Sequence, residues 1–343
     1  MVPGMTDRLL PDFSLQPCNT LGVSARAQWL ARITSRDDLL AVLADPRAAG
    51  LPCRVLGGGS NLVLGGDVAA LVLKVEIMGR RLVREDDAAW YVAAGAGENW
   101  HDFVQWTLAQ GYAGLENLSL IPGTVGAAPV QNIGAYGAEI KDHFFELTGY
   151  ALDGDEIRRF DSDTCQFAYR DSVFKQAEAG RWLIAEVVFR LPKQHALNTA
   201  YGDIETELTG AGLPRTAQGV AQAVINVRRR KLPDPAVIGN AGSFFKNPVV
   251  PADVCTALQQ QYPGLVAYPA GIGLMKLAAG WLIDQCGWKG RRLGPVGMYE
   301  KQALVLVNHG GASGADVTAL MQAVQADVRQ HFGVELEAEP VWW

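Results

Sequence analysis

The sequence predicts an α+β protein of two or three domains. Segments with strand-like and helix-like patterns alternate along its 343 residues, and irregular glycine-rich loops separate them. One hydrophobic core rarely serves a chain of this length. With 49% hydrophobic and 19% charged residues, the composition is that of an ordinary globular protein with a substantial core.

Bulk charge and cysteine usage exclude several classes of function. The net charge of −6 argues against general binding of nucleic acid or of anionic membranes. The five cysteines are scattered without a CxxC pair, and the five histidines show no ligand spacing, so we expect neither a disulfide framework nor a metal site. A reducing cytoplasm is the simplest location. The start of the chain lacks the pattern of a signal peptide, and no apolar stretch reaches the roughly 18 residues of a membrane span.

The first elements surround a glycine turn. After an irregular lead-in at 12–23, Ser35 and Asp38 resemble a capping box and predict a short helix over 39–45. A strand at 54–56 then enters Gly57-Gly58-Gly59-Ser60-Asn61, and strands at 62–64 and 70–75 follow. A strand–glycine turn–strand unit directs peptide N–H groups to one place, which makes residues 57–61 a candidate phosphate loop or an ordinary turn.

The remaining elements are predicted in the same way, from the periodicity of apolar residues and from the glycine or proline residues that end an element. We expect strands at 91–97, 145–152, 182–191, 303–308 and 334–339 and helices at 98–110, 217–231, 252–260, 274–287 and 315–332. Pro233 and Pro235 follow the helix at 217–231 and predict a domain boundary there.

The most unusual segment is the uncharged run 121–137, IPGTVGAAPVQNIGAYG, which contains four glycines. Its small side chains leave mainly backbone N–H and C=O groups for a ligand, and glycine permits close approach of the main chain. Gln131 and Asn132 add side-chain donors, and Tyr136 adds a flat ring. A buried turn and a cofactor cradle both fit this pattern. No GxGxxG opens a helix and no GK dipeptide is present, so a dinucleotide would be bound by neither a Rossmann motif nor a Walker motif.

Four further features could carry chemistry, and each has a structural alternative. Ser243 lacks the second glycine of a hydrolase elbow, so it is a turn residue or a donor. Arg170 lies beside Asp171 and could simply form an ion pair. The cations at 228–231 suit the C-terminus of a helix, although one or two of them could face a pocket. Glu339 is a strand carboxylate or a catalytic one.

Taken together and in order, four motifs resemble the UDP-N-acetylenolpyruvoylglucosamine reductase (UDP-N-acetylmuramate dehydrogenase) family. They are IPGTVGAAPVQNIGAYG at 121–137, YRDSVFK at 169–175, RRRKLPDP at 228–235 and GNAGSFFKNP at 239–248. The resemblance extends from LGGGSN to LEAE, and TAYGDI around Tyr201 is similar to the subtype with an extra tyrosine loop over the substrate.

The resemblance implies a vanillyl-alcohol-oxidase-like FAD-binding fold with a C-terminal α+β substrate-binding domain. We expect FAD-binding subdomains at 1–77 and 78–231 and the C-terminal domain at 232–343, whose last strand could return to the FAD-binding part. The implied reaction passes hydride from NADPH to FAD and then to the enolpyruvyl double bond of a UDP-sugar, in peptidoglycan synthesis. We also expect a cytoplasmic, monomeric protein without nucleic-acid or membrane partners.

Site residues are carried over by position. The implied catalytic residues are Arg170, Ser243 and Glu339. The implied flavin-binding residues are Gly57, Gly58, Gly59, Ser60, Asn61, Ile121, Pro122, Gly123, Thr124, Gly126, Asn132, Ile133, Gly134, Ala135, Tyr136, Gly137 and Arg228. The implied substrate-binding residues are Tyr201, Lys231, Asn247 and Gln302.

One departure from the family pattern leaves two candidates for the carboxylate. Only Pro340-Val341-Trp342-Trp343 follows Glu339, where a longer tail is expected, so Glu337 is the alternative. Two other functions also remain open. An FAD-dependent sugar or alcohol oxidase shares the expected fold but gives YRDSVFK and GNAGSFFKNP no role, and a non-catalytic nucleotide-sugar-binding protein would need no flavin.

Overall fold

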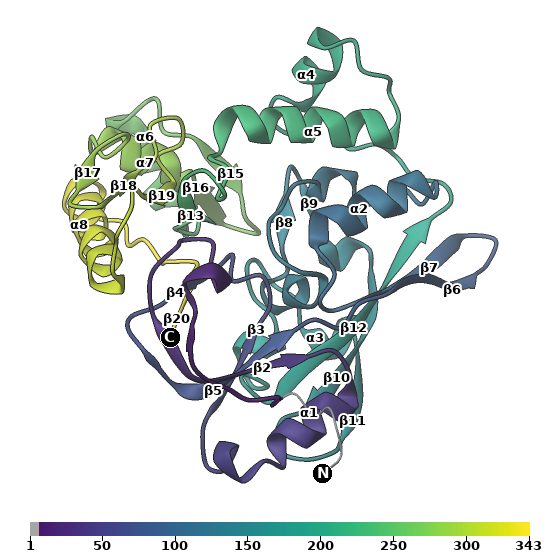
Figure 1. Cartoon of the computed structure of the whole chain (residues 1–343). Coiled ribbons are helices and arrows are strands. Elements are labelled where there is room, and N and C mark those ends of the chain that lie inside the picture. Colours follow the sequence, from purple (N-terminus) through teal and green to yellow (C-terminus); the bar gives the residue numbers. More distant parts are fainter. Residues whose placement is uncertain (1–6) are drawn as a thin grey trace, which may run out of the picture. The chain divides into compact units, whose positions relative to one another are not determined.

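The computed structural model describes residues 7–343, which form two compact units. Unit 1 holds residues 7–13, 27–59 and 69–230, and unit 2 holds residues 14–26, 60–68 and 231–343. Figure 1 labels their elements along the chain. The expectation that no signal peptide is present falls in part on residues 1–6, which lie outside the described residues.

Two sheets form the framework of unit 1. The first has the strand order β1-β2-β5-β3, with β3 parallel to β5, and the second is antiparallel with the order β11-β10-β12-β7-β6. The first comprises β1 (Leu10–Ser14), β2 (Arg26–Ile33), β3 (Cys53–Leu56) and β5 (Val68–Val75). The second comprises β6 (Arg80–Glu85), β7 (Ala89–Gly95), β10 (Phe144–Ala151), β11 (Ile157–Asp161) and β12 (Trp182–Pro192). Because β3 ends at Leu56, Gly57 emerges at the carboxyl end of a strand.

Helices and short turns complete unit 1. The helices are α1 (Arg36–Leu43), α2 (Trp100–Ala109), α3 (Ser162–Cys165), α4 (Ile204–Gly210) and α5 (Ala217–Lys231). The 3-10 turns are η2 (Pro46–Ala48), η3 (Glu116–Leu118), η4 (Val125–Gln131), η5 (Ile140–Asp142) and η6 (Val173–Lys175), and β8 (Gly134–Ala135) pairs with β9 (Ala138–Glu139). Trp100 and Phe103 of α2 are fully buried, with ring centroids 5.7 and 5.3 Å from that of Phe189 on β12. This packing fixes α2 on the second sheet.

Unit 2 contains smaller sheets. Its elements are η1 (Gln16–Cys18), β4 (Leu62–Val63), β13 (Gly239–Ser243), β14 (Val249–Pro251), α6 (Ala252–Gln261), β15 (Ala267–Pro269), β16 (Leu274–Leu277), α7 (Ala279–Gln285), β17 (Arg292–Leu293), β18 (Val296–Met298), β19 (Val305–Asn308), α8 (Gly314–Phe332) and β20 (Val341–Trp342). The sheet orders are β13-β19-β18-β17 and β14-β16-β15, and β20 pairs in parallel with β4. Gly333 ends α8 in the left-handed conformation, with φ of 66°.

The structure corrects three of the expected elements. The segment 334–339 alternates like a strand but forms only an isolated bridge, Phe245 to Ala338, and the terminal strand is β20 instead. Leu274 to Leu277 belong to strand β16, so the helix expected from 274 begins at Ala279. The lead-in at 12–23 is not wholly irregular, since β1 ends within it and η1 lies inside it.

Segments 14–26 and 60–68 join unit 2 through specific pairs. The Thr20 hydroxyl donates to the main-chain oxygen of Asn240 at 2.7 Å, and Leu62 pairs with Val341. The expected boundary at 231/232 lies one residue from the passage between units at Arg230–Lys231, whereas the expected boundary at 77/78 lies inside unit 1. The proposed division into two FAD-binding subdomains stays a prediction.

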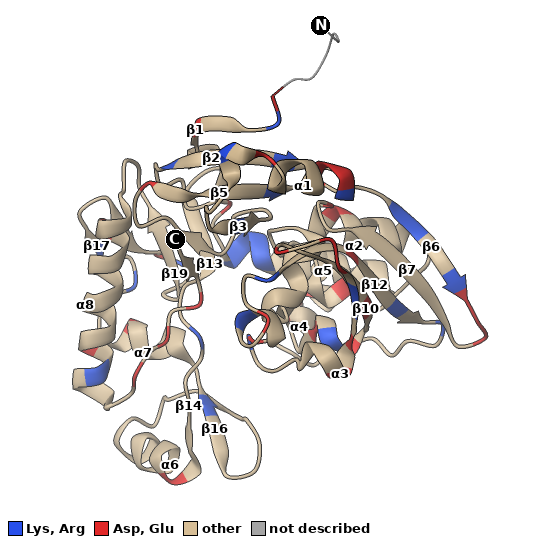
Figure 2. Ribbon diagram, turned by 90° about the horizontal axis from the view of Figure 1, so that it is seen from below, with Lys and Arg blue, Asp and Glu red and all other residues tan. Residues whose placement is uncertain are grey.

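Charged residues of both signs are spread over the elements. Figure 2 shows basic and acidic segments together on α8, for example, and the formal net charge of the chain is −6. Among residues 7–343, no helix is long and apolar enough to cross a membrane, and no cluster of three metal-binding side chains occurs.

Candidate active site

The two glycine-rich segments predicted to hold a cofactor lie against each other in unit 1. A Cβ atom added to Gly58 would lie 2.8 Å from Cα of Gly123, and one added to Gly57 would lie 2.6 Å from Oγ1 of Thr124. Both distances are too short for a real Cβ atom, so the close approach requires glycine at both positions. The main chains of the loops therefore meet without side chains between them, and peptide groups form their polar surface.

Thr124 carries a buried hydroxyl that has no hydrogen-bond partner among the described residues. It is the N-cap residue of η4, yet its side chain makes no capping bond. An unsatisfied buried polar group costs about 1–3 kcal/mol, and native proteins usually provide a partner. A ligand bound where Gly57 and Gly123 meet would supply that partner, so these residues fit a dinucleotide such as FAD.

Main-chain hydrogen bonds to α2 and to the segment after β7 hold the start of the run 121–137. Trp100 N–H donates to the Gly123 oxygen at 3.1 Å, and Gly126 N–H donates to the Ala96 oxygen at 3.0 Å. A Cβ on Gly126 would lie only 2.4 Å from that of Ala96. Gly126 thus permits close packing on the segment after β7, which makes the loop rigid before any ligand arrives.

Asn132 has a different role from the side-chain donor that the sequence suggested. Its Nδ2 donates to Oε2 of Glu139 at 2.8 Å and to the main-chain oxygen of Ala168 at 3.0 Å, and its Oδ1 accepts from Lys141 N–H. Both amide hydrogens are therefore used inside the protein. The residue is buried with φ of 45°, and it fixes the turn that leads into β8.

The structure brings Arg170 to the same loop. Its Nη2 donates to the main-chain oxygen of Gly134 at 2.9 Å, and its guanidinium lies 5.4 Å from the ring centroid of Tyr169. Arg170 itself has φ of 57°, a left-handed conformation that is uncommon for a residue with a side chain. These contacts orient a cation beside the β8–β9 hairpin.

The hairpin turn also contacts the segment that carries Tyr201. The ring of Tyr201 stands edge-on to that of Tyr136, with centroids 6.4 Å apart. Nδ2 of Asn117 donates to the main-chain oxygens of both Tyr136 and Asn198, at 3.0 and 2.9 Å, and Nδ2 of Asn198 donates to the Gly137 oxygen at 3.2 Å. The buried side-chain amide of Asn117 thus joins the flavin loop predicted at 121–137 to the substrate loop predicted around Tyr201.

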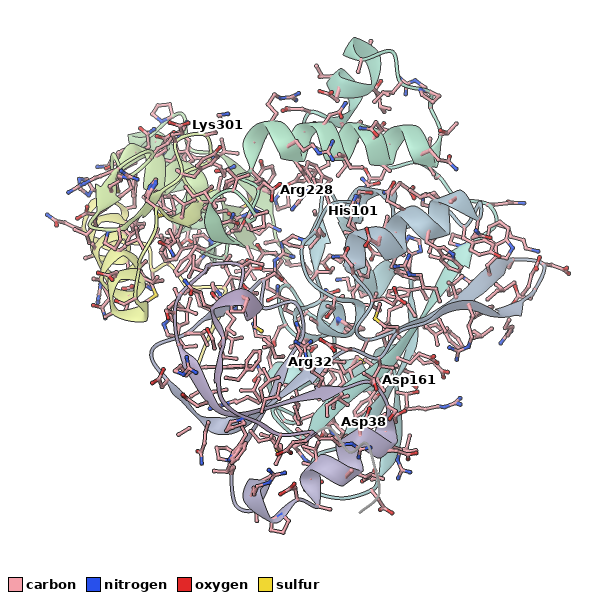
Figure 3. The ribbon with its side chains drawn as sticks, in the orientation of Figure 1. Arg32, Asp38, His101, Asp161, Arg228 and Lys301 are labelled. Atoms are coloured by element: carbon pink, nitrogen blue, oxygen red, sulfur yellow. The ribbon has the colours of Figure 1, made fainter. Side chains whose placement is uncertain are left out.

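Arg228 reaches the beginning of the run from α5. Its Nε donates to the main-chain oxygen of Leu120 at 3.2 Å, while the Leu120 N–H donates to Nδ1 of His101 at 3.0 Å. Figure 3 labels the two side chains. Burial lowers the pKa of the Arg228 guanidinium, and Tyr136 raises it. Arg228 nevertheless keeps its charge, because the guanidinium of arginine is not deprotonated in proteins.

In unit 2, the main chains beside Ser243 and at Glu339 are paired. Ser243 ends β13 opposite Val305, and the left-handed Gly242 precedes it. The next residue, Phe244, accepts a hydrogen bond from Glu339 N–H at 2.9 Å. Nδ2 of Asn61 donates to the main-chain oxygen of Glu339 at 3.2 Å, which places one predicted flavin-loop residue on the same segment.

The two candidate carboxylates have different surroundings. Glu337 is exposed and forms an ion pair with Lys246 at 2.5 Å. Glu339 is half-buried, and its main chain is tied to Phe244, the neighbour of Ser243. The main chain of Glu337 is paired with the same segment, since Lys246 N–H donates to its oxygen at 2.9 Å, so the two glutamates differ in exposure and in the ion pair of Glu337.

Asn247 and Gln302 meet at the first turn of α7. Oδ1 of Asn247 accepts from Ala279 N–H at 2.9 Å, and a Cβ on Gly280 would lie 3.1 Å from Oε1 of Gln302. Lys231 is the last residue of α5. The other predicted flavin residues, Gly59, Ser60, Ile121, Pro122, Ile133 and Ala135, lie in the two loops already described.

Sequence reasoning missed three residues that shape the site. Lys74 of β5 donates to the main-chain oxygen of Gly57, His101 binds Leu120, and Asn117 binds Tyr136. Asn117 lies between Glu116 and Ser119 in the stretch LENLSLIPG, so no local signal distinguished it. The contacts of Lys74 and His101 depend on tertiary structure.

Comparison with known protein families first shows the class of protein. A family model described as an FAD binding domain matches residues 27–158, which include both glycine loops. With the glycine cradle and the orphaned Thr124 hydroxyl, this makes the chain a flavoprotein with FAD as its cofactor, and the predicted cofactor and FAD-binding fold are confirmed.

The particular family follows from the rest of the chain. A model described as the C-terminal domain of UDP-N-acetylenolpyruvoylglucosamine reductase matches residues 234–343. UDP-N-acetylenolpyruvoylglucosamine reductase of Azoarcus sp. (strain BH72) is 60% identical, over 96% of this chain and 96% of its own length. The protein of that name from Burkholderia cenocepacia (strain HI2424) is 57% identical, over 97% and 96%. The crystal structure of the reductase from Thermus caldophilus matches with a TM-score of 0.68 at 24% identity and covers 98% of this chain and 99% of its own. The chain belongs to the UDP-N-acetylenolpyruvoylglucosamine reductase family.

Proposed function

We propose that this chain reduces the enolpyruvyl ether of UDP-N-acetylglucosamine-enolpyruvate to UDP-N-acetylmuramate, with NADPH as the hydride donor, in peptidoglycan synthesis. The 60% identity to a reductase of this name over nearly the whole chain supports the reaction. The pairing of Glu339 N–H with the Phe244 oxygen supports the catalytic assignment, because it joins the segments of two predicted catalytic residues. A cytoplasmic, monomeric protein is part of the same proposal, and its five cysteines are unpaired.

The FAD site is formed by the loops at 57–61 and 121–137. Peptide N–H groups and the Thr124 hydroxyl offer donors to the cofactor, and Arg228 offers a cation on the same side as Leu120. When bound, FAD accepts hydride from NADPH and passes it to the substrate.

Arg170 and Ser243 act on the reacting double bond. Hydride addition to the terminal carbon converts the CH₂ group to CH₃ and leaves an electron pair on the carbon that carries the ether oxygen and the carboxylate. A guanidinium can neutralise that carboxylate by a forked contact, and we assign this role to Arg170. Ser243 Oγ donates a proton to the anionic carbon, and its alkoxide recovers a proton from solvent. Glu339 assists by orienting these groups.

The remaining residues bind the sugar nucleotide. Lys231 and Tyr201 contact its diphosphate, and Asn247 and Gln302 contact the rest. Placement of Asn247 and Gln302 at the same turn of α7 supports a shared ligand. The contact between Tyr201 and Tyr136 supports a substrate loop that borders the flavin loop.

Anaerobic half-reactions test the proposal. NADPH should bleach the visible absorbance of the bound flavin, and the enolpyruvyl UDP-sugar should restore it with formation of the lactyl ether. Rapid reoxidation by oxygen, with a simple sugar as the reductant, would instead identify an oxidase. A colourless protein that cannot be reconstituted with FAD would leave only the nucleotide-sugar-binding alternative.

A further inference from the structure

Leu120 immediately precedes the run 121–137, and its backbone conformation is unusual. Its φ is 59°, in the left-handed region that residues with side chains rarely adopt. Both of its main-chain polar groups are bound by side chains. The N–H donates to Nδ1 of His101 on α2, and the C=O accepts from Nε of Arg228 on α5. The two labelled side chains in Figure 3 therefore clamp the first residue before the cofactor loop from two helices.

The hydrogen bond to Leu120 determines where His101 carries its proton. A peptide N–H can only donate, so Nδ1 must be the unprotonated nitrogen, and the neutral ring carries its hydrogen on Nε2. A second proton would have to enter at Nδ1. It would remove the lone pair that accepts from Leu120 and bring two donors face to face.

The charges around His101 favour the neutral ring. Burial lowers the pKa of His101, Asp102 on the same helix raises it, and Arg229 and Arg228 on α5 lower it again. From β6, Arg80 donates to the main-chain oxygen of Asp102 at 2.9 Å, and its charge is balanced by the buried Glu98, to which its Nε donates at 2.5 Å. His101 thus titrates below its ordinary range and accepts from Leu120 at neutral pH.

We propose that His101 is a positioning residue for the cofactor loop, which as a neutral acceptor holds Leu120 left-handed and as an imidazolium releases it and weakens the retention of FAD. The inference rests on the proposed placement of FAD at residues 121–137. When His101 accepts from Leu120, the loop is ordered before FAD binds. When the acceptor is lost, FAD binding must supply the free energy that orders Leu120, so the affinity falls. By linkage, FAD binding favours the neutral ring.

The test measures FAD release from the diluted holoenzyme, by the fluorescence of free FAD, at several pH values from about 8 to about 4.5, a range that extends below the ordinary histidine pKa because the pKa of His101 is lowered. Three proteins are compared: wild type, His101→Asn and His101→Phe. Asparagine can place an oxygen acceptor near the position of Nδ1 but does not titrate, and phenylalanine keeps a ring without an acceptor.

Each protein has a distinct expected pH profile. With a pKa of His101 that is about one unit lower in the FAD-bound form than in the free form, the dissociation constant of the wild type should rise on acidification and reach about tenfold once the pH is below both pKa values. His101→Asn should change by less than about threefold over the same range, and His101→Phe should be about tenfold weaker at every pH.

An identical acid response in wild type and His101→Asn would overturn the proposal. Asparagine does not titrate, so such a result would show that protonation of His101 does not cause the loss of FAD. If His101→Phe does not fold, the comparison of the other two proteins still decides. The ¹⁵N–¹H spectrum gives a second readout, and a ring protonated on Nδ1 at neutral pH would also contradict the proposal. Failure of every variant and of the wild type to bind FAD would instead disprove the proposed function.

Discussion

In the proposed mechanism Ser243 donates a proton although a hydroxyl is a weak acid, so its contribution should appear only when the substrate carries negative charge. We expect Ser243→Ala to leave flavin reduction by NADPH within about twofold of wild type. Transfer to the enolpyruvyl substrate should slow by about 10²–10³, the usual effect of removing a transition-state donor, or about 2.7–4 kcal/mol. Anaerobic stopped-flow spectroscopy measures the two half-reactions separately.

Ser243→Cys is the matched control, because a thiol can still donate a proton at nearly the same position. It should recover part of the second half-reaction. The main-chain pairing of Ser243 with Val305 does not involve the side chain, so neither substitution should disturb β13. Equal slowing of both half-reactions in Ser243→Ala would show that the hydroxyl is structural.

The second prediction about single residues concerns the carboxylates of Glu339 and Glu337. Glu339→Gln should slow substrate reduction at least about tenfold, because the proposed mechanism assigns Glu339 to orient the groups that act on the substrate. Glu337→Gln should retain normal kinetics and change the free energy of unfolding by at most about 1 kcal/mol, since it removes only an exposed ion pair with Lys246. Steady-state kinetics and urea unfolding measure these effects. A greater kinetic loss in Glu337→Gln would reverse the assignment.

At the scale of elements, the site depends on two loops that touch only because they lack side chains. Gly58→Ala would bring a Cβ atom to 2.8 Å from Cα of Gly123, and backbone atoms there cannot move without separating the loops. Overpacking costs about 1–3 kcal/mol, so the affinity for FAD should fall about tenfold to 100-fold. Calorimetric titration of the apoprotein with FAD measures this affinity.

Gly66→Ala is a suitable control for this substitution. It makes the same chemical change in a nearby loop, but a Cβ at Gly66 meets no atom within 4 Å and the residue has no left-handed φ. Its affinity for FAD should equal that of wild type. Equal affinity in Gly58→Ala would mean that the contact between the loops does not matter for the cofactor.

Elements with a clear local signal could be predicted from sequence. The helix expected at 217–231 matches α5, and the capping residue Ser35 accepts from Asp38 N–H as expected. Strand β2 was missed although Ala27, Ala31 and Ile33 are buried on alternate positions of it. The signal was therefore present but weak, because alanine has little strand preference.

Other elements could not be predicted because a strand needs a neighbour. The segment 334–339 has a clean alternation and buries Val334 and Leu336, yet its one bridge joins Ala338 to Phe245. Conversely, Leu274–Leu277 reads like the start of a helix but pairs with both β14 and β15. Pairing partners distant in sequence decided both cases.

At the scale of the whole molecule, both units are assembled from separate stretches of chain. Asn308 donates to the Leu21 oxygen at 2.9 Å, and Leu62 pairs with Val341, so unit 2 closes on segments from the N-terminal part. The glycines entered the predicted site through their local pattern, and Arg170 entered it through the resemblance of YRDSVFK to the family motif. The supports at Asn117, Lys74 and His101 join residues that only the complete fold brings together.

One such support should control the pH dependence of stability. The carboxylate of Glu116 is buried, accepts from Gly114 N–H at 2.7 Å, and forms an ion pair with Nε2 of His195. Burial by itself would raise the pKa of Glu116, but the hydrogen bond and charge of His195 outweigh it, so this pKa is lowered. The hydrogen bond to Glu116 raises the pKa of His195 despite burial.

The two shifts define a pH window for the stability that the pair contributes. The contribution of His195 is complete below its unfolded pKa of about 6.5 and is lost as the pH rises through its higher folded pKa. That of Glu116 is present above about 4.3 and is lost as the pH falls through its lower folded pKa. The pair should therefore stabilise the protein most between about pH 4.3 and 6.5.

The pKa of the neighbouring His143 is lowered by burial and by the charge of His195 and is raised by Glu116, so it would change between the proteins of a double-mutant cycle. A cycle with Glu116→Gln and His195→Gln made in a His143→Gln background therefore isolates the contribution of the pair. The coupling energy from urea unfolding should reach about 1–3 kcal/mol near pH 5.5 and decline toward pH 8, because above about pH 6.5 the unfolded His195 is neutral and must take up a proton to form the pair. Each single substitution should cost more than the double one, since it leaves a buried group unpaired. A coupling energy that stays constant from pH 5.5 to about pH 8 would show that the pair is held by a neutral hydrogen bond rather than by charge.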